Sequence, residues 1–277
     1  MEFFEHYFEN GGIHLKYARS AISVRDQEIH DYYEFVFFLG GSARFSSKSI
    51  QRNLSLGDVI FIPKNAFHLF SVQGNDYTRC ILGFYETPAL AGLLGAIGGE
   101  VCLIESPAEM LSALIGGVLD AVERQMPKEE MTLYLEASIV HLLFEFKRRA
   151  GDNSGKNIGV SRLVRDVLSL VDERYSKYLT VDIIASELHI SKSLLSHTFK
   201  EEMGISVYQY ISKKRLSVAG EMIAAGIPVT RAATQSGFAD YSCFLRMYKA
   251  QYGCAPTERN ETKKTLRHVF FENSLEK

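Results

Sequence analysis

Two segments in the C-terminal half of the chain, 181–207 and 229–256, repeat one residue pattern, and this repeat limits the fold more than any other feature. Residues of the first copy return at an offset of 48 and then of 49, so one residue is inserted in the intervening turn. The matching pairs are Val181 and Val229, Ala185 and Ala233, Ser193 and Ser242, Phe199 and Tyr248, Lys200 and Lys249, and Gly204 and Gly253. Each copy predicts a short helix, a turn and a second helix.

Each copy also carries the residues that begin, pack and end its second helix. Ser or Asp suits the N-cap, apolar residues four apart face a core, and Gly suits the positive φ at a helix end. A small residue in the first helix lets the second helix cross closely. These residues are Ser191 and Asp240, Leu195 with Phe199 and Phe244 with Tyr248, Gly204 and Gly253, and Ala185 and Ala233. The pattern indicates helix-turn-helix units, whose second helix can enter the major groove of DNA.

A single long helix is predicted over 207–225, between the two copies. Its 19 residues would span about 28 Å at about 1.5 Å per residue. One turn of DNA measures roughly 34 Å, so this helix would set two recognition helices near successive major grooves. Lys213, Lys214 and Arg215 form a basic run that suits phosphates, although such a run can also be a solvated helix face.

The N-terminal half begins with a strand pattern and ends with a helix pattern. Short aromatic and β-branched runs at 34–39, 58–63 and 80–85 alternate with turn signals, which is typical of a barrel or sandwich. The spacing becomes helical over 108–125 and 128–149. In the second of these helices the predicted apolar stripe consists of Leu133, Ala137, Val140, Leu143 and Phe144.

Charge divides between the two halves, although the whole chain has a formal net charge of -2. Residues 157–277 carry 17 Lys and Arg against 13 Asp and Glu, whereas residues 1–156 carry 14 against 20. We therefore expect only the second half to meet a polyanion. The segment 151–159 between them is rich in Gly, Asn, Asp and Ser, which is the composition of a linker.

Cysteine use and the N-terminus disfavour a secreted or membrane protein. The four cysteines lie far apart without metal-binding spacing, as expected for free thiols in a reducing cytosol. The first twelve residues lack a basic stretch followed by an apolar one, so we expect no signal peptide. The most apolar window, 89–99, has about half the length that a membrane span needs. We expect a cytoplasmic protein with no membrane partner.

From Leu179 to Pro256 the chain resembles the DNA-binding domain of the AraC/XylS family of bacterial transcription regulators. The resemblance rests on ISKSLLSHTFK at 190–200, GISVYQYISKKRLSVA at 204–219, SGFADYSCFLRMYKAQYG at 236–253 and APTE at 255–258. Two positions depart from the family pattern. Ala232 stands where a large aliphatic residue is usual, and Arg259 with Asn260 replaces an aromatic residue and an Arg.

The resemblance implies double-stranded DNA as a partner and two sets of contact residues. Base contacts are implied for Ser193, Ser196 and His197 on the first recognition helix and for Tyr241, Ser242, Cys243 and Arg246 on the second. Arg246 suits bidentate bonding to guanine, whereas a small residue such as Ser196 or Cys243 can instead merely permit close approach. Phosphate contacts are expected from Lys192, Lys200, Lys213, Lys214, Arg215 and Lys249.

The first half resembles the cupin-like sensor domain that is common in this family. The resemblance rests on HDYYEFVFFLGGSARF at 30–45 and LSLGDVIFIPKNAFHLF at 54–70. The residues expected to line a pocket for a small polar effector, such as a sugar, are His30, Tyr32, Glu34 and His68. Metal-binding cupins have a further His where Tyr32 stands, so we expect no bound metal and no cofactor. Tyr32 can alternatively be part of the barrel packing.

The sequence thus predicts an α+β chain with two domains. Its parts are a cupin-like β-barrel with amphipathic helices over 1–150, a linker at 151–159, an all-α double helix-turn-helix domain over 160–260 and a charged tail at 261–277. We expect a transcription regulator and not an enzyme. The resemblance implies a homodimer through the helix at 128–149, although the apolar stripe of this helix can instead pack on its own barrel. Activation would add RNA polymerase as a partner. Two alternatives stay open: a metal-dependent cupin enzyme fused to a DNA-binding domain, and a regulator controlled by a protein partner without a small-molecule effector.

Overall fold

The computed structural model divides the chain into two compact units, 1–160 and 161–277. The residues that it describes are 4–20, 25–105, 108–150 and 160–257. The predicted linker at 151–159 and the predicted tail at 261–277 therefore lie outside the described residues. Among the described residues, no helix is both long and apolar enough to cross a membrane.

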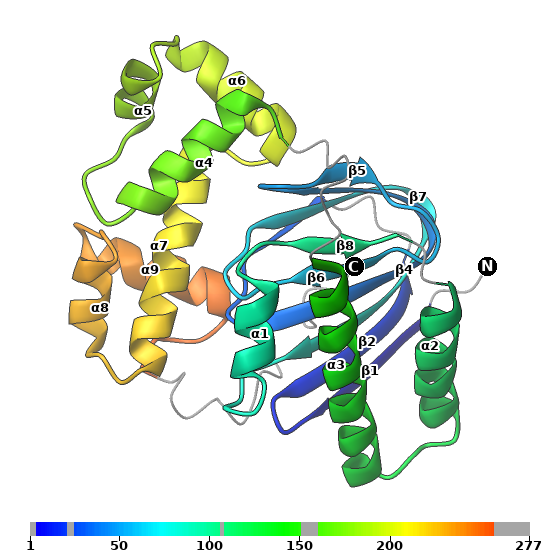
Figure 1. Ribbon diagram of the computed structural model, residues 1–277. Coiled ribbons are helices and arrows are strands. Elements are labelled where there is room, and N and C mark those ends of the chain that lie inside the picture. Colours follow the sequence, from blue (N-terminus) through cyan, green and yellow to red (C-terminus); the bar gives the residue numbers. More distant parts are fainter. Residues whose placement is uncertain (1–3, 21–24, 106–107, 151–159, 258–277) are drawn as a thin grey trace. The chain divides into compact units, whose positions relative to one another are not determined.

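An antiparallel sheet of eight strands forms the framework of the N-terminal unit in the part of the chain that the structure describes (Figure 1). The strands are β1 (Phe4–Asn10), β2 (Ile13–Ser20), β3 (Arg25–Glu28), β4 (Tyr33–Ser47), β5 (Gln51–Asn53), β6 (Val59–Ile62), β7 (His68–Phe84) and β8 (Cys102–Ile104). Six of them follow the order β1-β2-β7-β4-β6-β8. The register between β4 and β7 shifts on both sides of Gly40, as at a β-bulge. Beyond this irregularity, the C-terminal part of β4 also pairs with β5, and the N-terminal part of β7 also pairs with β3.

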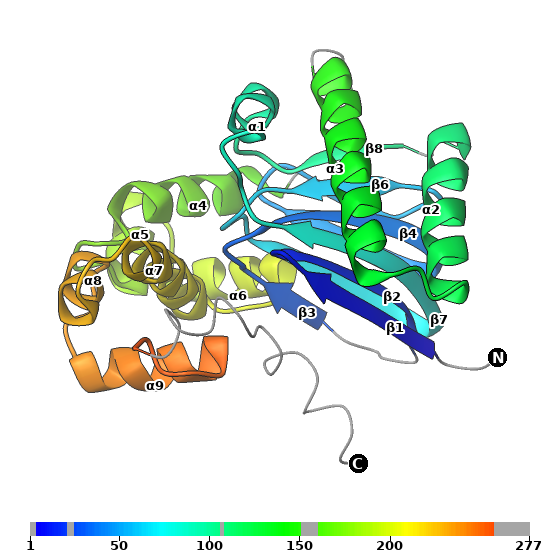
Figure 2. The same ribbon diagram turned by 90° about the horizontal axis from the view of Figure 1, so that it is seen from below.

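Three helices cover one face of this sheet: α1 (Ala91–Ile97), α2 (Ala108–Glu123) and α3 (Lys128–Ala150) (Figure 2). Side chains alternate along β4, because successive residues of a strand point to opposite faces. Phe35 and Phe37 belong to the core beneath the helices, whereas Val36 and Phe38 belong to a second core on the other face. The predicted order of strands followed by helices, and the cupin-like fold, are confirmed.

Helix α3 packs on the sheet through a different face from the predicted stripe. Of that stripe Leu143 is buried, whereas Leu133 is 65% and Phe144 54% exposed. The ring of Phe146 instead packs against Phe35 and Phe61, at centroid distances of 5.5 and 5.7 Å. The other buried side chains of the packed face are Met131, Leu135, Ile139 and Leu142. Helix α3 is apolar on two sides, and the side that carries Phe146 packs on the sheet.

The C-terminal unit is helical throughout the part of the chain that the structure describes. Its helices are α4 (Arg162–Arg174), α5 (Val181–Glu187), α6 (Lys192–Met203), α7 (Val207–Ala224), α8 (Val229–Gln235) and α9 (Tyr241–Tyr252). The two copies of the repeat are α5 with α6 and α8 with α9. The predicted long helix between them is α7, which ends one residue earlier than expected.

The residues that the repeat predicts at helix starts and ends cap the helices in the structure. The Ser191 hydroxyl accepts a hydrogen bond from Leu194 N at 3.1 Å, and the Asp240 carboxylate accepts one from Cys243 N at 3.0 Å. Gly204 and Gly253 end α6 and α9 with the same left-handed conformation, at φ 70°. The predicted core pairs, Leu195 with Phe199 and Phe244 with Tyr248, are fully buried. The predicted pair of helix-turn-helix units is therefore confirmed.

Candidate nucleic-acid interface and effector site

The residues of α6 that are predicted to contact DNA lie on one exposed face of the helix. Leu195 and Phe199 are buried in the unit, so the opposite side of the helix faces solvent. The exposed residues on that side are Lys192, Ser193, Ser196, His197 and Lys200. This face offers hydroxyl, imidazole and ammonium groups, which can bind base edges and phosphates.

Helix α9 presents an equivalent face. The exposed residues on this face include Tyr241, Ser242, Arg246 and Lys249. Cys243 is half-buried, and its Sγ lies 3.8 Å from the sulfur of Met247. Cys243 is therefore less available than its neighbours, which agrees with the alternative that a small residue here permits close approach.

Sequence reasoning missed one residue on the exposed face of α6. Leu194 is 51% exposed and occupies the position that Cys243 has on α9. An apolar residue in a helix is usually buried in the core, so hydrophobicity alone does not predict the exposure of Leu194. The repeat itself contains the signal, because its register aligns Leu194 with a predicted base-contact residue. An apolar side chain here can contact the methyl group of thymine.

Arg215, a predicted phosphate contact, is held by backbone carbonyls within the C-terminal unit. Its Nε donates to the Tyr175 carbonyl at 2.7 Å and its Nη2 to the Lys177 carbonyl at 2.9 Å. Partial burial lowers the pKa of the guanidinium group from its usual value. Both carbonyls lie in the connection between α4 and α5, so Arg215 joins α7 to that connection.

A glycine of the second repeat lies against the same junction. Gly237 has φ +96°, and a Cβ atom there would lie 2.8 Å from the Tyr175 oxygen and 3.0 Å from Arg215 Nε. Contacts that short do not occur without displacement of the neighbours. The turn between α8 and α9 therefore packs on the junction that Arg215 makes with the connection between α4 and α5.

Two predicted phosphate contacts form ion pairs with carboxylates. Lys192 Nζ lies 2.9 Å from Asp182 Oδ2, and Lys214 Nζ lies 2.9 Å from Asp172 Oδ1. The first pair is well exposed, and exposed ion pairs contribute about 0–1 kcal/mol, so Lys192 can exchange its carboxylate for another anion at little cost.

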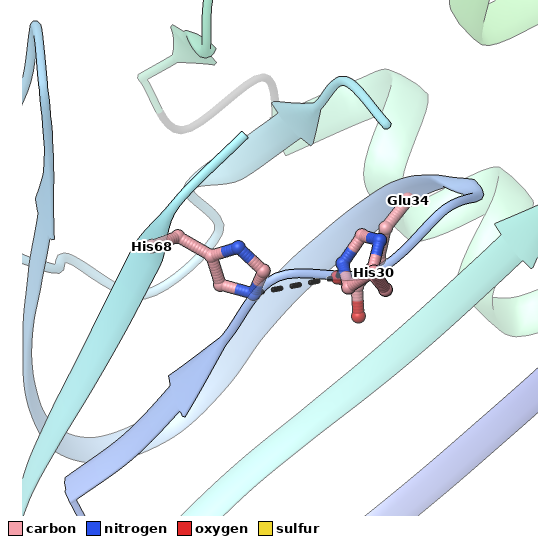
Figure 3. A group of neighbouring side chains, drawn as sticks. All are labelled: His30, Glu34 and His68. Carbon is pink, nitrogen blue, oxygen red and sulfur yellow. Dashed lines mark hydrogen bonds and ion pairs between the residues drawn. The ribbon is translucent and has the colours of Figure 1, made fainter. Parts of the chain in front are cut away.

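In the N-terminal unit, His30, Glu34 and His68 form a buried polar cluster (Figure 3). Glu34 lies in β4, His68 begins β7, and His30 precedes β4. His30 Nε2 is 2.7 Å from Glu34 Oε2, and His68 Nε2 is 3.7 Å from the same oxygen. One ligand atom from each residue lies within 4.8 Å of the others, so the cluster could hold a metal ion.

Aromatic rings enclose one side of this cluster. The ring of Tyr32 stacks on His30 with the centroids 3.9 Å apart, and His14 meets Tyr32 edge-on at 4.6 Å. His14 and Glu34 are both paired with Gly83 in the sheet, and a Cβ on Gly83 would lie 2.0 Å from the His14 ring. Sequence reasoning missed His14. A glycine inside an apolar strand is the signal that could have indicated such a close approach.

Two protein-family models match the chain. An AraC-like ligand binding domain matches residues 10–143, and a helix-turn-helix domain matches residues 184–261. The first covers the sheet from β2 onward and most of α3, including the polar cluster. The second begins inside α5 and includes α6 and α9.

The chain is similar to several transcription regulators. It is 30% identical over 232 residues to the RCS-specific HTH-type transcriptional activator RclR of Escherichia coli, across 76% of this chain and 77% of that protein. It is 23% identical over 237 residues to the probable transcriptional regulator LumQ of Photobacterium leiognathi, across 82% of this chain and 89% of that protein. A crystal structure of ToxT from Vibrio cholerae covers 92% of this chain and 99% of its own, with 16% identity and a TM-score of 0.40.

The contacts of Arg215 predict a role in stability. Arg215→Ala should lower the free energy of unfolding by about 1–3 kcal/mol, because two backbone carbonyls lose their charged donor. Arg231→Ala is the matched control, since Arg231 is an exposed arginine of α8; it should change stability by less than about 0.5 kcal/mol. Urea unfolding followed by circular dichroism measures both. Equal, small effects would contradict the role of Arg215 in joining α7 to the connection between α4 and α5.

Proposed function

We propose that α6 and α9 read a specific double-stranded DNA sequence under control of the N-terminal unit. The premise is that this chain belongs to the AraC family of DNA-binding transcription regulators. The chain is a regulator and not an enzyme, so the alternative of a metal-dependent cupin enzyme is set aside. The observation that carries the proposal is the pair of exposed helix faces, each fixed by the same capping geometry. The protein would act in the cytoplasm, where its DNA lies.

The base-reading residues in this proposal are unequal in strength. Arg246 can form two hydrogen bonds to guanine O6 and N7, the strongest specific contact available here. The weaker readers are Ser193, Ser196 and His197 on α6 and Tyr241, Ser242 and Cys243 on α9. The proposed phosphate contacts are Lys192, Lys200, Lys213, Lys214, Arg215 and Lys249, and these would position the protein without reading sequence.

The role of Arg246 can be tested with a DNA sequence selected from a random pool. Arg246→Ala should weaken binding to it by about 1–3 kcal/mol and relax the preference at one base pair. Lys249→Ala, on the same helix, should weaken binding to all sequences alike and lower the salt dependence by about one unit. Fluorescence anisotropy over a range of salt measures both. If Arg246→Ala weakens all sequences equally, Arg246 does not read a base.

For the N-terminal unit we propose a small polar effector, such as a sugar, held at His30, Tyr32, Glu34 and His68. The support is their juxtaposition, since the cluster combines hydrogen-bonding groups with an aromatic face. Glu34 and Phe35 are consecutive in β4 and face opposite sides of the sheet, and Phe35 contacts Phe146 of α3. A change at the cluster could thus alter how α3 packs and shift the population of DNA-binding arrangements.

A second candidate function is control by a protein partner without a small-molecule effector. It is favoured by the bulky side chains that occupy the sheet face opposite the helices. Phe38, Phe45, Phe70 and Tyr77 are buried together there. A face filled by the protein's own rings leaves less room for a ligand than an open barrel would.

A thermal-shift screen of the full chain against sugars, organic acids and aromatic compounds separates these two functions. One class of compound should raise the unfolding midpoint by mass action. Glu34→Gln should abolish that rise, whereas Glu100→Gln, an exposed glutamate in the same unit, should retain it. A screen without any stabilising compound would contradict the effector and favour the protein partner.

The exposed stripe of α3 supports a homodimer. Leu133, Val140 and Phe144 are all more than a third exposed, although the opposite side of the helix is packed on the sheet. Burying an apolar residue of this size is worth about 1.5–3 kcal/mol, so two copies of the stripe would stabilise each other. A regulator of this kind that activates transcription would also contact RNA polymerase.

Charges introduced into the stripe should separate the dimer. Leu133→Glu and Phe144→Glu should each lower the mass in solution to that of a monomer, because a carboxylate cannot be buried without a partner. Leu56→Glu is the matched control, since Leu56 is an apolar residue of the same unit that is 69% exposed. Sedimentation equilibrium measures the mass. A dimer that persists in both variants would contradict this interface.

A further inference from the structure

In contrast to the expectation from the sequence that no metal binds, we propose that His30, Glu34 and His68 bind one divalent first-row transition-metal ion, such as Zn²⁺ or Fe²⁺. This ion would be bound by the same residues as the proposed effector, so the inference deepens the proposed effector site. The regulatory role of the ion rests on that proposed function. Three protein ligands leave open positions on such an ion. A polar effector with hydroxyl or carboxylate oxygens could occupy one of them.

The distances within the cluster suit one ion. His30 Nε2 and His68 Nε2 lie 2.7 and 3.7 Å from the same oxygen of Glu34, and one ligand atom of each residue is within 4.8 Å of the others. Ligand atoms around a tetrahedral ion with bonds of about 2.0 Å are roughly 3.3 Å apart. Small rotations of the two imidazoles would therefore bring all three atoms to bonding distance.

Backbone carbonyls hold the two imidazoles in the orientation that a metal ligand needs. His30 Nδ1 lies 2.8 Å from the Tyr32 carbonyl, and His68 Nδ1 lies 3.1 Å from the Ala66 carbonyl. A carbonyl oxygen only accepts, so in both bonds Nδ1 carries the hydrogen and donates. This is the arrangement of metal-ligating histidines, whose second nitrogen donates to a carbonyl or carboxylate while Nε2 faces the ion.

The burial and the donor set indicate the class of ion. All three residues are at most 6% exposed, and Glu34 and His68 lie in the neighbouring strands β4 and β7. Two imidazoles and one carboxylate suit Zn²⁺ and Fe²⁺, whereas Ca²⁺ and Mg²⁺ need more oxygen ligands. The competing explanation is an ion pair of Glu34 with His30 that only supports the fold.

Metal binding by the full chain, purified without a histidine tag, distinguishes these explanations. Zn²⁺ titration followed by elemental analysis should give one ion per chain, and Co²⁺ should produce visible absorption bands from nitrogen and oxygen ligands. Glu34→Gln and His68→Gln should each weaken Zn²⁺ binding at least about 100-fold, because even changes to the groups that orient the ligands cost about 10–100-fold. The matched controls are Glu100→Gln and His6→Gln, whose side chains are exposed in the same unit.

Circular dichroism of each variant shows whether it is folded, and only folded variants are compared. Less than one Zn²⁺ or Co²⁺ per chain in the unsubstituted protein, or binding that survives both cluster substitutions, would overturn the metal site. Binding of the selected DNA by metal-free protein is measured alongside. DNA binding without metal binding would reject this inference alone, whereas metal binding without DNA binding would reject the proposed function and leave the ion site standing.

Discussion

Arg215 joins three parts of the C-terminal unit at one point. Its guanidinium group donates to the Tyr175 and Lys177 carbonyls, and Gly237 of the second repeat lies against the same atoms. The charged hydrogen bonds and the close glycine contact thus connect α7 and the turn between α8 and α9 to the connection between α4 and α5.

The N-terminal unit uses the alternation of β4 for two purposes. Phe35 and Phe37 pack beneath the helices, whereas Glu34 points to the other side, toward two histidines. A buried carboxylate is costly unless it is paired, and His30 and His68 provide that pairing. The cluster and the helix-facing core are therefore adjacent along the same strand, since Glu34 of the cluster is followed by Phe35, which contacts Phe146 of α3.

Helix α3 shows how one sequence pattern can serve two surfaces. Its packed side is held by aromatic contacts of Phe146, and its exposed stripe includes Leu133 and Phe144. In the proposed homodimer this stripe would be covered by a second copy, and the helix would connect the sheet of one copy to the helix of another.

Much of this protein followed from the sequence because local physics decides it. The caps at Ser191 and Asp240 and the glycine ends of α6 and α9 depend on residues a few positions apart, so the repeat alone predicted them. The long-range pairings were decided by the tertiary structure. The sheet register brings His14 over Gly83, places His68 beside Glu34 and selects the packed face of α3, and the helix packing holds the side chain of Arg215, a predicted phosphate contact, on backbone carbonyls. These features depend on contacts between segments far apart in the chain, and a local sequence pattern does not predict which of their atoms will be in contact.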